Sequence, residues 1–111
     1  MFNPSNQFVF APIKLGYCDK KDGKVNQKHI NFYKARSRHT GTVIYEPLYI
    51  DEKLRELPSQ LGIDNDDKIE GLKELNEIVQ KNGALAVAHL NHPGRQAHPK
   101  IPGNYYVSST N

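Results

Sequence analysis

The chain has 111 residues, a hydrophobic fraction of 37% and a formal net charge of +3. This length allows one small domain, and its basic residues are scattered among acidic ones, which argues against a nucleic-acid partner. A single cysteine, Cys18, excludes an internal disulfide framework and a cysteine-rich zinc site. No apolar run approaches the roughly 20 residues of a membrane span, and the first residues lack a signal-peptide pattern. We therefore expect a cytoplasmic protein without a membrane partner.

The first apolar run is Phe-Val-Phe-Ala-Pro-Ile at residues 8–13. Aromatic and β-branched residues favour a strand, and Pro12 belongs at its end because proline cannot donate a hydrogen bond to a neighbouring strand. Residues 14–24 predict a loop, with a turn at the Lys-Asp-Gly sequence of residues 21–23.

A helix is predicted next, over residues 27–39. Asn26 can cap its first turn, because its side chain can accept a hydrogen bond from a free backbone N–H group. Gly41 is expected to end the helix, as a C-terminal glycine commonly does.

The second strand is predicted at residues 42–45, Thr-Val-Ile-Tyr, and it runs into Glu46 and Pro47. Residues 48–62 then carry mixed charge, and Pro58 prevents a long helix there. We interpret this segment as an excursion between the second strand and the next helix.

The clearest element is a second helix, which begins at the acidic residues 64–67, where the helix dipole favours negative charge. The Asn-Gly pair at residues 82–83 is expected to end it. Apolar residues recur at helical spacing and predict one stripe that packs into the core: Ile69, Leu72, Leu75 and Val79.

The third strand is predicted at residues 84–88, Ala-Leu-Ala-Val-Ala, and is expected to be buried on both faces, as in a parallel sheet. The sequence then becomes polar at His89, Asn91 and His92. Such residues at the C-terminal end of a strand indicate a ligand site, because ligands bind at that end in α/β proteins.

The order of elements is strand, helix, strand, helix, strand, which predicts an α/β fold with parallel strands and right-handed crossovers. The three strand ends would meet at one edge, where they carry residues 12–14, 46–47 and 89–91. Three strands make an unfinished sheet, and a (β/α)8 barrel needs roughly 250 residues. We therefore expect residues 1–111 to be a single partial domain.

Four segments form an ordered set of motifs: Asn-Gln-Phe-Val-Phe-Ala-Pro at residues 6–12, Asp-Gly-Lys-Val at 22–25, Tyr-Lys-Ala-Arg at 33–36 and His-Leu-Asn-His-Pro-Gly-Arg-Gln-Ala at 89–97. In this order they resemble the first strand, first loop, first helix and third-strand signature of the old yellow enzyme family, the NADH:flavin oxidoreductases. The resemblance spans almost the whole chain and covers only the first part of the family's barrel.

The resemblance implies the N-terminal part of a TIM (β/α)8 barrel, about three βα units long. It also implies FMN, held without a covalent link at the C-terminal face, and hydride transfer from NAD(P)H through the flavin to an activated carbon–carbon double bond. The family's substrate-anchoring pair, its proton-donating tyrosine and its FMN-phosphate loops would lie beyond residue 111.

By the same resemblance, Pro47 would back the flavin after the second strand. His89 would take the place of a glutamine that usually bonds the pyrimidine edge of the flavin, and a neutral imidazole also offers one donor and one acceptor. The end of the first strand would line the flavin through four residues: Ala11, Pro12, Ile13 and Lys14.

Several of these residues allow two interpretations. His89 could instead be a histidine at the core edge that the backbone satisfies, but the surrounding signature favours the flavin role. Lys14 could favour negative charge on reduced flavin, or it could lie in solvent. For His92, Gly94 and Arg95 we favour a structural role in the loop after the third strand, with Gly94 allowing a tight turn and Arg95 pairing with a carboxylate.

A metal site is a third interpretation of the histidines, since His89, His92 and His98 follow one another closely. No fixed helix or cysteine pair supports that site, so we expect none. Glu46 could act as a general base, but we expect it to pair with a neighbouring lysine or arginine. Cys18 is assigned no role in tuning the flavin.

The sequence thus predicts a segment of an FMN-dependent oxidoreductase that uses NAD(P)H and a small-molecule substrate. The alternative is a non-catalytic remnant or association subunit. Its motivation is the unfinished sheet, whose last strand would leave an edge open to pairing with the rest of a barrel or with a second copy.

Overall fold

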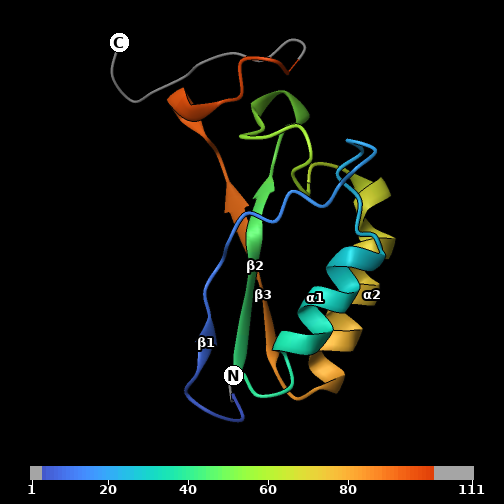
Figure 1. Cartoon of the computed structure of the whole chain (residues 1–111), viewed down its shortest axis with the longest axis vertical. Coiled ribbons are helices and arrows are strands. Elements are labelled where there is room, and N and C mark those ends of the chain that lie inside the picture. Colours follow the sequence, from blue (N-terminus) through green and yellow to red (C-terminus); the bar gives the residue numbers. More distant parts are fainter. Residues whose placement is uncertain (1–3, 102–111) are drawn as a thin grey trace.

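A computed structural model describes residues 4–101 of the chain, in which three parallel strands form one sheet in the order β1–β2–β3. The strands are β1 (Val9–Phe10), β2 (Thr42–Tyr49) and β3 (Leu85–Asn91). The helices α1 (Gln27–Arg36) and α2 (Ile69–Lys81) lie side by side on the same side of this sheet (Figure 1). The predicted order of elements and the parallel strands are therefore confirmed.

Three short 3₁₀ helices lie in the connections: η1 (Glu52–Leu54), η2 (Asp66–Lys68) and η3 (Gly94–Gln96). The excursion after β2 contains η1 and returns to the sheet through a parallel bridge between Tyr49 and Gly62. Neither described helix has the length and apolar character that crossing a membrane requires.

Helix α1 begins with a reciprocal cap. The Asn26 side chain accepts a hydrogen bond from Lys28 N, and His29 Nδ1 accepts one from Asn26 N. These two bonds satisfy N–H groups that the helix itself leaves free. The predicted cap at Asn26 is confirmed.

Helix α1 ends at Arg36, three residues earlier than predicted. Ser37 N donates to Tyr33 O, and Thr40 Oγ1 donates to Arg36 O, so polar groups close the last turn. Gly41 was expected to end the helix, and this prediction is wrong. A Cβ at Gly41 would lie 2.1 Å from Asn6 O, so glycine is needed there because the N-terminal segment approaches closely.

Helix α2 ends at Lys81 with Asn82 as its C-cap, and Gly83 has φ +91°, as the Asn-Gly pair predicted. Leu75 and Val79 are fully buried, but Ile69 is 58% exposed, so its place in the core stripe is wrong. At about 100° per residue, Ile69 lies about 90° from the mean direction of the other stripe residues. The stripe that faces the sheet therefore begins after Ile69.

Strand β2 does not end at Tyr45 but continues through Pro47 to Tyr49. Ile44 pairs with Val87 and Pro47 pairs with His89, so the register shifts between the two pairs. Two residues of β2 therefore oppose one residue of β3, which is a β-bulge. A bulge is one of the few places where a sheet tolerates proline.

Strand β3 also extends past its predicted end, to Asn91. It was expected to be buried on both faces, and this is wrong: Ala88 is exposed and Leu90 is 63% exposed. Strand β3 is one of the two outer strands of the sheet, and the described helices cover only part of one of its faces. The exposure of Leu90 follows from that position.

The core lies between the sheet and the two helices. Its aromatic centre is Tyr33 of α1 against Tyr45 of β2, with ring centroids 5.0 Å apart in an edge-to-face arrangement. A second cluster joins Cys18 of the loop after β1 to Leu48 and Leu61. The buried residues of the main cluster come from four segments: Tyr33, Val43, Tyr45, Leu75, Val79 and Ala84.

Candidate functional site at the strand ends

The predicted site lies where β2 and β3 end next to each other. Pro47 and His89 are direct register partners in the parallel ladder, so their side chains point to the same side of the sheet. Ile44 and Val87 are partners on that side as well, and all four side chains are only half-buried. We call this the open face of the sheet, because α1 and α2 lie on the other face.

His89 has a buried ring atom without a partner. Within residues 4–101, His89 Nδ1 and Asn91 Nδ2 are buried and make no hydrogen bond. Buried polar atoms in folded proteins are nearly always hydrogen-bonded, so each such atom indicates a missing partner. The alternative interpretation of His89 required a backbone group to bond its ring. No backbone group of the described chain bonds Nδ1.

Pro47 is held by the excursion after β2. Gln60 is buried, and its Nε2 donates to Pro47 O at 2.9 Å while its Oε1 accepts from Glu56 N at 2.7 Å. Both ends of the Gln60 amide are therefore used to hold the chain around Pro47. The sequence did not indicate this role, because Gln60 lies in a segment without a clear pattern.

The residues after β1 lie outside the regular ladder. Ala11, Ile13 and Lys14 are exposed and Pro12 is half-buried. Lys14 Nζ forms an ion pair with Glu56, a residue of the excursion after β2. The structure thus joins the segment after β1 to the excursion after β2 through an ion pair that neither interpretation of Lys14 predicted.

Glu46 was expected to pair with a lysine or arginine, and this prediction is wrong. It is 2% exposed, its Oε2 accepts from Tyr33 Oη at 3.1 Å, and its Oε1 lies 3.8 Å from His29 Nε2. Burial raises the pKa of Glu46 to about 7, although hydrogen bonds from Tyr33 and from the backbone of Leu61 oppose that shift. The bulge turns Glu46 toward the helices, away from the open face, where a general base would be needed.

His29 and Cys18 complete this buried group. Burial lowers the pKa of His29 to about 4, and its Nδ1 accepts from Asn26 N, so the ring is neutral with its proton on Nε2. Cys18 Sγ lies 3.9 Å from that nitrogen and donates to Lys24 O. Burial raises the pKa of Cys18 to about 12, which leaves an unreactive thiol.

The loop after β3 has the structural role that was predicted for two of its residues. His92 Nδ1 accepts a hydrogen bond from Gly94 N, and Gly94 has φ +57°, a conformation that glycine adopts without strain. A carboxylate partner for Arg95 stays a prediction. No three histidine, cysteine, aspartate or glutamate side chains within residues 4–101 lie together as a metal site requires.

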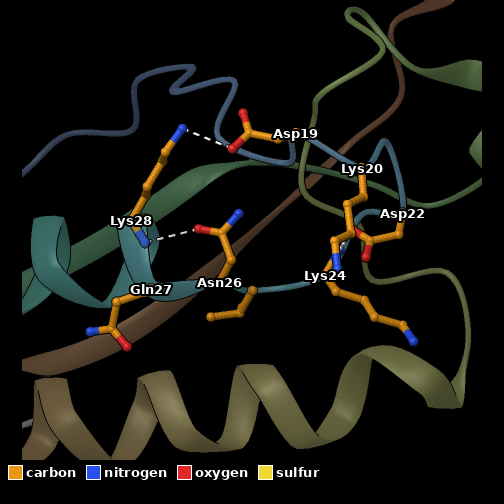
Figure 2. A pocket seen from close by; sticks show the side chains of 8 residues that line it. Asp19, Lys20, Asp22, Lys24, Asn26, Gln27 and Lys28 are labelled. Carbon is orange, nitrogen blue, oxygen red and sulfur yellow. Dashed lines mark hydrogen bonds and ion pairs between the residues drawn. The ribbon is translucent and has the colours of Figure 1, made fainter.

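A separate pocket of about 420 Å³ lies beside the start of α1 (Figure 2). Three of its five charged residues form ion pairs: Lys28 Nζ lies 2.8 Å from Asp19 Oδ2, and Lys24 Nζ lies 3.9 Å from Asp67 Oδ2. The lining holds three lysines and two aspartates, so its formal net charge is small. Residues of the loop after β1 and the first two residues of α1 line it: Asp19, Lys20, Asp22, Lys24, Val25, Asn26, Gln27 and Lys28.

Residues 4–106 match the NADH:flavin oxidoreductase / NADH oxidase family, and the chain belongs to this family. It is 37% identical over 100 residues to the NADH:acrylate oxidoreductase of Vibrio harveyi, a match that covers 90% of this chain and 10% of that protein. It is 38% identical over 93 residues to the NADPH dehydrogenase of Halalkalibacterium halodurans, covering 83% of this chain and 28% of that protein.

Solved structures show the same arrangement of elements. The old yellow enzyme from Trypanosoma cruzi matches with a TM-score of 0.79 and 25% identity, covering 88% of this chain and 26% of that one. A 2-naphthoyl-CoA reductase in complex with 2-naphthoyl-CoA matches with a TM-score of 0.82 and 25% identity, covering 86% of this chain and 14% of that one. The fold is therefore the first part of a TIM barrel, as predicted, and the chain spans less than a third of each of these proteins.

The family uses FMN, with NAD(P)H as the reductant. The open face fits one edge of such a flat heteroaromatic ring in two respects. Pro47 presents an apolar surface beside His89, and the unpartnered His89 Nδ1 and Asn91 Nδ2 provide polar atoms that need a partner. These atoms match the donors and acceptors of a pyrimidine edge.

Proposed function

We propose that this chain forms one wall of an FMN site in an oxidoreductase that uses NAD(P)H to reduce activated carbon–carbon double bonds. The observation that carries the proposal is His89, with its buried and unpartnered Nδ1, beside Pro47 on the open face. Membership of the NADH:flavin oxidoreductase family supports it. When bound, FMN would supply the hydride chemistry, and the protein would supply binding and orientation.

Each site residue has a specific part in this proposal. His89 would exchange hydrogen bonds with the pyrimidine edge through its one donor and one acceptor. Pro47 would pack against the ring, held in place by Gln60. The segment after β1 would cover the ring with Ala11, Pro12 and Ile13, while Lys14, paired with Glu56, would hold that segment against the excursion.

We further propose that additional polypeptide supplies the remaining barrel strands, the substrate-anchoring residues and the phosphate loops. The support is that β1 and β3 are the outer strands of the described sheet, whereas in the solved relatives the sheet continues into a full TIM barrel. We call this chain together with those strands the complete barrel. The coding sequence after codon 111 is the first thing to read, since it shows whether they are continuous with this chain. A cytoplasmic location stays a prediction.

The test is an FMN titration of the complete barrel, followed by flavin fluorescence, and an assay of NAD(P)H oxidation with an enone. We expect the protein to bind FMN and to oxidise NAD(P)H. His89→Ala should weaken FMN binding roughly tenfold, because a hydrogen bond to a buried group is lost. His39→Ala is the matched control, because His39 is exposed and lies outside the site. A complete barrel that binds no FMN would contradict the proposal.

The alternative, an association subunit without activity, has one observation in its favour. Apolar side chains at both outer strands are exposed: Phe8 by 75%, Val9 by 57% and Leu90 by 63%. Exposed strand edges with apolar side chains tend to pair with other chains. Assembly of this chain into a stable complex that neither holds FMN nor oxidises NAD(P)H would favour this alternative.

A further inference from the structure

The bulge in β2 decides which residue reaches the open face. Tyr45 and Glu46 together oppose Ala88, and both are 2% exposed because both point toward the helices. In a regular strand, side chains alternate between the two faces. Without the extra residue, position 46 would face the open side and Pro47 would face the helices. The pairing of Pro47 with His89 on the open face therefore depends on the bulge.

A bulge leaves backbone groups outside the ladder, and here Tyr33 satisfies one of them. Glu46 N donates to Tyr33 Oη at 2.9 Å, and Tyr33 Oη in turn donates to Glu46 Oε2 at 3.1 Å. The hydroxyl thus holds both the backbone and the side chain of the same bulge residue. A buried N–H without a partner would be costly, so these bonds stabilise the bulged register.

The position of that hydroxyl is determined by packing. Tyr33 is 1% exposed, and its ring meets Phe32 and Tyr45 edge-to-face, with centroids 5.2 and 5.0 Å away. Tyr33 belongs to α1, so the helix carries its hydroxyl to the bulge from the side opposite the open face. The excursion after β2 holds the bulge from another direction, through the backbone of Leu61 to Glu46 and through Gln60 to Pro47.

We propose that Tyr33 is a positioning residue for the flavin site: its hydroxyl holds the β2 bulge at Glu46 and thereby keeps Pro47 beside His89 on the open face. The consequence for FMN rests on the proposed function. Tyr33 itself lies on the helix side and acts through Glu46. Its effect is expected on how the flavin is held and on its surroundings, beyond any effect on stability.

The test compares Tyr33→Phe with Tyr45→Phe in the complete barrel. Both changes keep the ring and remove one buried hydroxyl; Tyr45 Oη donates to Asn76 Oδ1 at 2.7 Å, on α2 and away from the bulge. Both variants should lose thermal stability, and Tyr33→Phe should lose more because it removes two hydrogen bonds and Tyr45→Phe removes one. Tyr33→Phe should weaken FMN binding roughly tenfold and change the visible circular dichroism of the flavin, whereas Tyr45→Phe should stay within about threefold of wild type. Equal effects of the two variants on FMN binding and flavin circular dichroism, or no such effect of Tyr33→Phe, would overturn the proposal.

A second pair of variants covers the case in which Tyr33→Phe does not fold. Glu46→Ala removes the acceptor of the Tyr33 hydroxyl, and Asn76→Ala removes the acceptor of the Tyr45 hydroxyl. Only Glu46→Ala is expected to weaken FMN binding, by several-fold, and to change the flavin circular dichroism. The opposite ranking would count against the role of the bulge.

A measurement without flavin separates this inference from the proposed function. If the wild-type complete barrel binds no FMN, the proposed function fails, and NMR of the flavin-free protein still tests the bulge. Tyr33→Phe should speed hydrogen exchange at the Glu46 amide and shift the His89 ring signals, while Tyr45→Phe should do neither. Unchanged His89 signals in Tyr33→Phe would overturn the positioning role.

Discussion

Glu46 and His29 face each other in the core, and burial moves the pKa of each group in the direction that keeps it neutral. The pKa of Glu46 rises from 4.5 to about 7, and that of His29 falls from 6.5 to about 4. Around Glu46 lie His29 and Tyr33 of α1, Cys18 of the loop after β1 and the backbone of Leu61. No lysine or arginine of the described chain forms an ion pair with Glu46.

The two shifts give opposite dependences of stability on pH. Between pH 4.5 and 7 the folded chain holds a proton on Glu46 that the unfolded chain has lost, so the free energy of unfolding falls as pH rises. Between pH 6.5 and 4 the unfolded chain binds a proton at His29 that the folded chain does not, so stability falls as pH falls. In wild type the two slopes largely cancel over the shared range.

His29→Gln should reveal the Glu46 slope alone. Glutamine at the third helical position keeps an acceptor for Asn26 N, and it does not titrate. We expect the free energy of unfolding of this variant to fall by up to about 3 kcal/mol between pH 4.5 and 7, because one pKa unit corresponds to about 1.4 kcal/mol. Urea unfolding across this range measures it, with His39→Gln as the exposed control. A flat or rising profile for His29→Gln would contradict the burial of Glu46.

At the scale of the elements, helix α2 shows how a pattern of apolar residues can include one residue too many. The apolar residues at 69, 72, 75 and 79 have helical spacing, yet Ile69 turns away from the sheet while Leu75 is fully buried. At about 100° per residue, Ile69 points about 90° away from the direction that the other three share, so it lies at the margin of the stripe.

Leu75→Ala and Ile69→Ala form a matched pair on this helix. Leu75→Ala should lower the free energy of unfolding by about 2–5 kcal/mol, since it leaves a cavity in a packed core. Ile69→Ala should stay within about 0.5 kcal/mol, because its side chain is already mostly in water. Denaturant unfolding of the two variants checks this, and comparable losses would show that Ile69 is buried after all.

At the scale of the whole described chain, the main feature is that each of the two outer strands has one edge without a partner strand. Strand β1 has only two residues in the ladder, and β3 presents Leu90 to solvent. In a barrel the outer strands pair with further strands, and closure removes the open edges. Chain-to-chain association at these edges is the expected behaviour of the chain by itself.

Leu90→Lys should therefore shift this chain toward monomer in sedimentation velocity at a fixed protein concentration. A charge on an outer strand opposes edge-to-edge pairing, and the change removes an exposed apolar side chain. Ile69→Lys is the control, because Ile69 has a similar exposed fraction of 58% but lies on α2. An equal shift in both variants would indicate general surface hydrophobicity instead of pairing at β3.

The sequence by itself determined the alternation of strands and helices, the cap at Asn26, the end of α2 and the meeting of Pro47 and His89 at one edge. These features depend on local chemistry: apolar periodicity, capping side chains, and the rule that parallel strands end on the same side. The motif at residues 89–97 indicated the family, because a long motif carries more information than any single residue.

Only the tertiary structure decided the bulge of β2, the burial of Glu46 and the contacts of Tyr33 and Gln60. Tyr33 and Glu46 are 13 residues apart, and the hydrogen bonds that join them exist only after α1 has packed on the sheet. A bulge shifts every later side chain to the other face, and no local pattern around residues 42–49 shows it in advance. Which residues reach the open face was therefore decided by packing between elements distant in the sequence.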